Sequence, residues 1–188
     1  MKNFLLPITF LIFFLLPFCI KETPPAEEES PEWGEANALL NGVPWKATCA
    51  TTLSDVYPGK FSLLLTHYNS KGFVRGRLSF RHVPIEIGTY YPVDYPVENQ
   101  SLHDSTLTCS CHSLQDDGDV AGDRYVLWYD SALMFRLERI DSQTKEIWGT
   151  FRGMFKKHIF SDIGYELDPR SPDTLIFEAG SFHAKLSR

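Results

Sequence analysis

The chain has 188 residues, of which 43% are hydrophobic and 22% are charged, which fits one globular domain with a sizeable core. The formal net charge is −6, but residues 21–35 hold six glutamates against one lysine, and residues 36–188 carry 16 basic and 18 acidic side chains. Because a nearly neutral domain without a basic stripe attracts phosphates weakly, we expect no nucleic-acid partner.

Residues 1–18 have the pattern of a lipoprotein signal peptide. After Lys2, an uncharged apolar run extends to residue 18, which is shorter than the about 20 residues of a transmembrane helix. The run Leu16–Cys19 (LPFC) resembles a lipobox, in which the cysteine thiol is acylated and becomes the mature N-terminus. We therefore expect Cys19 to anchor the protein in the cell envelope, on the periplasmic or surface face of the outer membrane. An ordinary secretory signal peptide and an uncleaved anchor are the alternatives.

Residues 19–35 are expected to form an acidic tether between the lipidated cysteine and the domain. From Lys21 the sequence KETPPAEEESPEWGE is rich in Pro and Glu and has almost nothing to bury, so it cannot offset the entropy of folding. Acidic residues close behind the lipidated cysteine also resemble surface-export signals of Bacteroidota lipoproteins, while the solubility of a linker explains the same glutamates. We place the start of the domain at Ala36.

Residues 36–188 have the alternation and the turn signals of an all-β domain. Asn41-Gly42 predicts a type I′ turn between two short strands, because both central positions of this turn need a positive φ. Residues 60–68 and 73–81 flank a second turn at Asn69–Gly72. In the later of these two segments, apolar and basic side chains alternate as in a half-exposed strand.

Further strands are expected toward the C-terminus, with a bulge at Gly180 in the last one. No window outside the signal peptide has convincing helical periodicity. About ten short strands predict an antiparallel β-sandwich or β-barrel, and the pattern does not distinguish the two. The expected segments are 105–114, 124–130, 134–141, 146–156 and 174–186.

Four motifs in the domain resemble those of small Bacteroidota lipoproteins of unknown function. They are NGVPWKA at 41–47, IGTYY at 87–91, DSQTKEIWGTF at 141–151 and EAGSF at 178–182. The resemblance rests on their order and spacing and covers about residues 36–186. It implies a lipid-anchored β domain and no assigned activity.

The cysteines of the domain are candidates for a disulfide. Cys109 and Cys111 are two residues apart, so both side chains lie on the same face of a strand. We expect Cys49 to form a disulfide with one of them, as suits an oxidising compartment. Three buried thiols, or a soft-metal site with His112 or His103, are the alternatives. Since C-x-C lacks the C-x₂-C spacing of zinc sites, we expect no metal and no cofactor.

Two loops are candidate ligand sites. Tyr90, Tyr91 and Tyr95 are possible ligand-facing residues, because tyrosine combines an apolar ring with a polar tip. A rigid aromatic loop that caps a sheet is the alternative reading. Residues 116–123 hold four aspartates, which suit Ca²⁺, but aspartate and glycine also form good turns, and we expect a solvated loop there.

The sequence holds no recognisable catalytic motif. It lacks G-x-S-x-G and H-E-x-x-H, and its S-x-x-K at residues 142–145 falls in an expected turn. We therefore predict a non-catalytic, envelope-anchored domain that binds an unidentified partner or supports an assembly. A small-ligand carrier with a lipocalin-like cavity is the alternative, and a hydrolase with a site not visible in the sequence is the second alternative. An apolar interior cavity of a few hundred Å³ would favour the carrier.

Overall fold

The computed structural model of the chain describes residues 33–94, 106–115, 120–128, 133–158 and 171–187. The predictions for the signal peptide, for Cys19 and for the tether up to residue 32 fall outside these ranges. So do those for Tyr95, His103 and residues 116–119. Among the described residues, no helix is long and apolar enough to cross a membrane.

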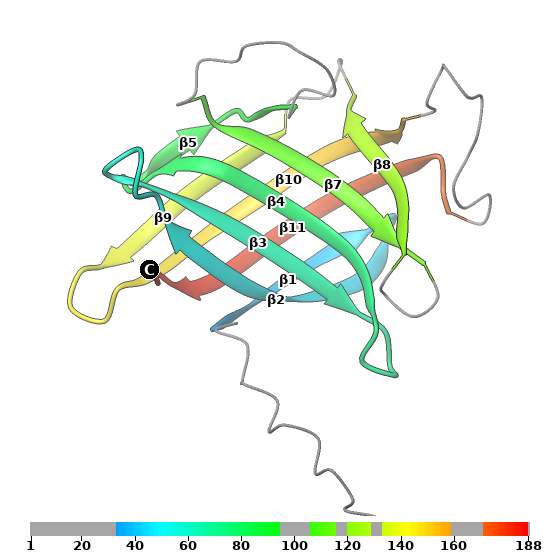
Figure 1. The fold of residues 1–188 in the computed structure, drawn as a ribbon, viewed down its shortest axis with the longest axis horizontal. Coiled ribbons are helices and arrows are strands. Elements are labelled where there is room, and N and C mark those ends of the chain that lie inside the picture. The colour runs from blue at the N-terminus through cyan, green and yellow to red at the C-terminus, as the bar shows by residue number, and fades with distance from the viewer. Residues whose placement is uncertain (1–32, 95–105, 116–119, 129–132, 159–170, 188) are drawn as a thin grey trace, which may run out of the picture. The chain divides into compact units, whose positions relative to one another are not determined.

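The described ranges contain β-strands and no helix, which confirms the all-β prediction (Figure 1). The strands are β1 (Gly34–Leu40), β2 (Val43–Leu53), β3 (Lys60–Tyr68), β4 (Val74–Pro84), β5 (Gly88–Tyr90), β6 (Val93–Asp94), β7 (Thr108–Leu114), β8 (Ala121–Leu127), β9 (Met134–Asp141), β10 (Glu146–Lys157) and β11 (Thr174–Lys185).

Eight of these strands close into an antiparallel barrel, so of the two architectures that the sequence left open the barrel is the one formed. Around the wall the order is β1-β2-β3-β4-β7-β8-β10-β11, and β11 pairs with β1 to close it (Figure 1). β8 pairs with β10 only near the end of β10, and β9 pairs with the rest of that edge. β5 extends the sheet beyond β9, and β6 pairs in parallel with β7.

The β1–β2 hairpin turns where the sequence predicts it. Asn41 and Gly42 have φ values of 50° and 77°, as a type I′ turn requires. The Asn41 side chain also joins the hairpin to β11. Its Nδ2 donates to the Thr174 carbonyl at 2.9 Å, and its Oδ1 accepts from the Ile176 amide at 2.8 Å.

Alternating side chains fill the barrel on one face of each strand and meet solvent on the other. In β4, Leu78 and Phe80 are buried, while Arg77 and Arg81 are exposed, which confirms the predicted alternation. In β10, the predicted inner face is also observed, with its three large side chains fully buried: Ile147, Phe151 and Phe155.

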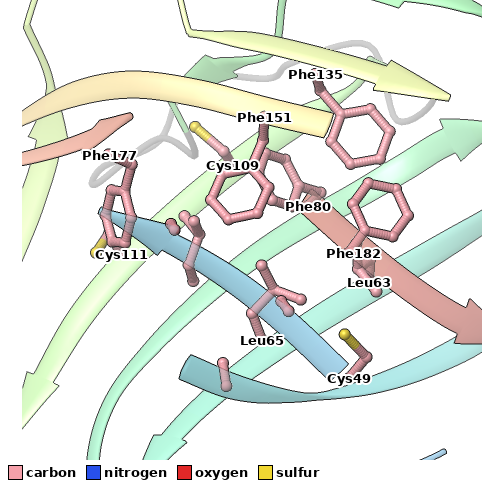
Figure 2. Packing of buried hydrophobic residues seen from close by; sticks show 14 of the residues in the cluster. Cys49, Leu63, Leu65, Phe80, Cys109, Cys111, Phe135, Phe151, Phe177 and Phe182 are labelled. Carbon is pink, nitrogen blue, oxygen red and sulfur yellow. The ribbon is translucent and has the colours of Figure 1, made fainter. Parts of the chain in front are cut away.

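Phenylalanine rings fill one half of the barrel, away from the β1–β2 and β3–β4 turns. Phe80 lies 4.7 Å from Phe135 and 6.1 Å from Phe151 between ring centroids, and Phe135 stacks on Phe182 at 5.2 Å. Figure 2 shows these rings together with the cysteines of the core. These rings therefore form a packed aromatic core in this half of the barrel.

The N-terminal boundary of the domain differs from the prediction. β1 begins at Gly34, and the amide of Lys185 donates to the Trp33 carbonyl at 3.4 Å. The Trp33 ring also packs edge-on against His183, with 5.2 Å between centroids. The start of the domain expected at Ala36 is therefore too late, because an aromatic ring inside the acidic segment contacts the barrel wall.

Two expected details of later strands are also changed. β8 begins at Ala121, so Asp123 lies in a strand and not in a solvated loop. It is tolerated there because its buried carboxylate is 3.7 Å from the Lys157 ammonium. The bulge expected at Gly180 is present in β11, and the positive φ of 48° belongs to its neighbour Ala179.

Candidate ligand cavity

A cavity of about 420 Å³ lies inside the barrel, at the end where the β1–β2 and β3–β4 turns and the last residues of β7 lie. Eight-stranded barrels are just wide enough to be filled by side chains or to hold one small ligand, and ligand sites have volumes of about 300–1,000 Å³. The residues that line it are Leu40, Trp45, His67, Arg75, Gly76, Arg77, Leu78, Cys111, His112, Ser113, Leu114, Gln115, Tyr125, Ser171, Pro172, Leu175 and Phe177.

The space exists because small residues occupy inward positions on neighbouring strands. Gly76 of β4 pairs with His67 of β3 on one side and with Ser113 of β7 on the other. A Cβ at Gly76 would meet only one atom within 4 Å, the His112 carbonyl oxygen at 3.5 Å. The wall is therefore bare backbone at this point, where other strands place large side chains.

Rigid apolar side chains form most of the inner surface of the cavity. Trp45 of β2 is 6% exposed and packs edge-on against Phe177 of β11, with 5.2 Å between centroids. Leu78 of β4 is 1% exposed and forms the next layer inward from Gly76. Such a surface favours an apolar ligand, since each buried CH₂ group contributes about 0.8 kcal/mol.

His67 is the polar group whose orientation is best defined in this wall. Its Nδ1 lies 2.6 Å from the Lys46 carbonyl oxygen, and because a carbonyl only accepts, Nδ1 carries the hydrogen. The imidazole also stacks on Trp45, with 5.8 Å between centroids and 30° between planes. Among the described residues no hydrogen bond reaches Nε2, so this atom is available to a ligand.

Buried polar contacts hold the chain segment before β11 at the edge of the cavity. The Tyr125 hydroxyl donates to the Pro172 carbonyl at 2.9 Å, and the Lys157 ammonium donates to the Ser171 carbonyl at 2.7 Å. Lys157 also lies 3.7 Å from the Asp123 carboxylate, and both side chains are only 3% exposed. Loss of one partner of a buried ion pair is strongly destabilising. The Lys157–Asp123 pair therefore helps to hold the segment before β11 in place at the edge of the cavity.

The structure contradicts the expected disulfide of Cys49. The strand register runs from Cys49 through Leu65 and Leu78 to Cys111. Three steps of about 4.8 Å put these cysteines about 14 Å apart along the sheet, beyond the about 7 Å that a disulfide spans. Cys109 lies two residues farther along β7, no disulfide joins the three cysteines, and all three are buried (Figure 2).

The two cysteines of β7 share the inner face of the barrel, and Cys111 lines the cavity. Burial first, and the nearby Asp94 carboxylate second, raise the pKa of Cys111 to about 12, so its sulfur is a neutral thiol. His112 points to the opposite face of β7, as alternation requires. In the described ranges no three His, Cys, Asp or Glu side chains converge as metal ligands would.

The tyrosines singled out in the sequence lie away from the cavity. Tyr90 pairs with Phe135 through β5 and β9, and its hydroxyl donates to the Glu86 carbonyl at 2.8 Å. Tyr91 is 65% exposed and does not line the cavity. Neither ring is therefore among the residues that line the cavity, although Tyr90 packs against the edge of the core.

His67 and Trp45 are not among the ligand residues predicted from the sequence. The available signal was the alternation in β3, which places His67 on the inner face with Leu63 and Leu65. In the structure, the cavity is marked by a polar residue at an inward position, His67, that pairs with a glycine, Gly76.

No model of a protein family matches this chain, and neither a curated protein nor a solved structure matches it.

Proposed function

We propose that this protein is an envelope lipoprotein that binds one small, mainly apolar ligand inside its β-barrel. The observation that carries the proposal is the cavity of about 420 Å³, which lies between strands of the barrel and is lined mostly by buried apolar side chains. A concave apolar site with few polar groups is typical of small-molecule binding.

This observation favours the ligand carrier over a domain that only supports an assembly, because a protein partner would use an exposed surface and not the barrel interior. It also disfavours the hydrolase. None of the described residues that line the cavity is Asp or Glu, so His67 has no acidic partner among them of the kind used in general acid–base catalysis.

A lipid on Cys19 is the second part of the proposal. It would hold the barrel at the membrane, where apolar ligands are concentrated, and the glutamate-rich tether would keep the domain in solvent. The resemblance of the sequence motifs to small Bacteroidota lipoproteins supports the same placement.

Titration with an apolar fluorescent probe tests the binding function. We expect saturable binding of one probe per chain, with quenching of Trp45, and we expect Cys111→Phe to weaken it at least about tenfold by filling the cavity. Cys111→Ala is the matched control, because it changes the same inward position without filling the space. Probe binding that is unsaturable, or equal in both variants, would contradict the proposal.

A further inference from the structure

We propose that the ligand of the cavity carries a carboxylic acid group, and that Nε2 of His67 binds this group. The inference rests on the proposed binding function and adds the chemical class of the ligand. It begins from the two contacts that fix the imidazole, the hydrogen bond from Nδ1 to Lys46 and the stacking on Trp45.

The surroundings of His67 leave space for a ligand group next to the ring. His67 pairs with Gly76 of the neighbouring strand, which has no side chain to fill the space beside it. The next residue pair inward, Leu65 and Leu78, is fully buried and apolar. A ligand therefore meets the polar His67 near the end of the barrel and the apolar layer of Leu65 and Leu78 beyond it, which is the layout for an acid with an aliphatic chain.

A carboxylic acid suits Nε2 in either arrangement of the shared proton. A neutral acid donates its O–H to the neutral imidazole, and a carboxylate accepts from the protonated imidazole as a charge-assisted hydrogen bond. An alcohol can donate to or accept from the imidazole but carries no charge, so it forms no charge-assisted pair, and an ester has no hydrogen to donate.

The charges of the cavity lining favour the same ligand class. Arg75 and Arg77, at the solvent-facing positions of β4, border the cavity, and none of the described lining residues is Asp or Glu. A positive potential of this kind attracts a carboxylate and repels an amine. The shape of the cavity and the sign of its charge thus point to an aliphatic monocarboxylic acid.

Calorimetric titration of the folded domain with dodecanoic acid and with its methyl ester tests the inference. We expect the acid to bind at least about tenfold more tightly than the ester, or about 1.4 kcal/mol. In His67→Phe, which keeps a flat ring on Trp45, the preference should vanish while the affinity for the ester changes less than about twofold. The matched control is His183→Phe, the same substitution at an imidazole that stacks on Trp148 outside the cavity, and it should keep the preference.

His67→Asn is the second variant, because its amide nitrogen can still donate to the Lys46 carbonyl while Nε2 is absent. In the wild-type protein, ¹⁵N NMR should show a shift of the His67 Nε2 resonance with the acid and none with the ester. Equal affinity for acid and ester would overturn the inference and leave the binding function standing. A preference that survives in both His67 variants would also overturn it. No binding of acid, ester or apolar probe would refute the binding function itself.

Discussion

At the scale of single residues, the missing side chain of Gly149 decides how the packed half of the barrel is built. Gly149 is a buried residue of β10. A Cβ at this position would overlap the Arg136 carbonyl oxygen and would lie 2.5 Å from Cζ of Phe182. The Phe182 ring can stack on Phe135 only because this space is empty.

We expect Gly149→Ala to lower the free energy of unfolding by about 1–3 kcal/mol, because an added methyl in a packed core forces its neighbours apart. Gly76→Ala is the control. It lies in the same kind of strand, but its nearest contact is 3.5 Å away, so its unfolding free energy should change by less than about 1 kcal/mol. Urea unfolding measures both variants, and equal losses would refute this account of the core.

At the scale of the elements, the features that depend on neighbouring residues follow from the sequence. The segments predicted at 60–68 and 134–141 coincide with β3 and β9, since their alternation is regular and turn residues bound them. The turn at Asn41-Gly42 is also as predicted, because few residue pairs accept two positive φ values.

The features that depend on strand order could not be predicted in the same way. Alternation places Cys49 and Cys111 on inner faces, but it does not say that β3 and β4 lie between their strands. The predicted disulfide is wrong for this reason. Asp123 was expected in a loop, because its partner Lys157 is distant in the sequence and only the fold makes the pair.

At the scale of the whole domain, the barrel combines a packed half and a hollow half. Large rings meet where Phe80, Phe135 and Phe182 converge, and small residues such as Gly76 leave space at the other end. Closure of the sheet removes nearly all strand edges among the described strands. Within the barrel, we assign stability to the packed half of the core and the proposed ligand binding to the hollow half. The sequence predicts the β class, whereas the cavity emerges only when the eight strands close.

The proposed lipid anchor depends on residues 1–35 of the intact chain, so it is tested in cells. We expect Cys19→Ser to abolish palmitate labelling and to release the protein from membranes, because the acyl chains supply the membrane affinity. The same substitution at the buried Cys49 is the control and should leave labelling unchanged. Membrane association and labelling that persist in Cys19→Ser would refute the lipid anchor.

The central claim is that an apolar chain occupies the hollow half of the barrel. A crystal of the domain grown with 12-bromododecanoic acid tests it most directly, because anomalous scattering locates the bromine without reference to any other atom. We expect one bromine peak among Leu78, Cys111 and Phe177, inside the cavity of about 420 Å³. A bromine peak on the outer wall, or none at a concentration that saturates binding in solution, would contradict the account.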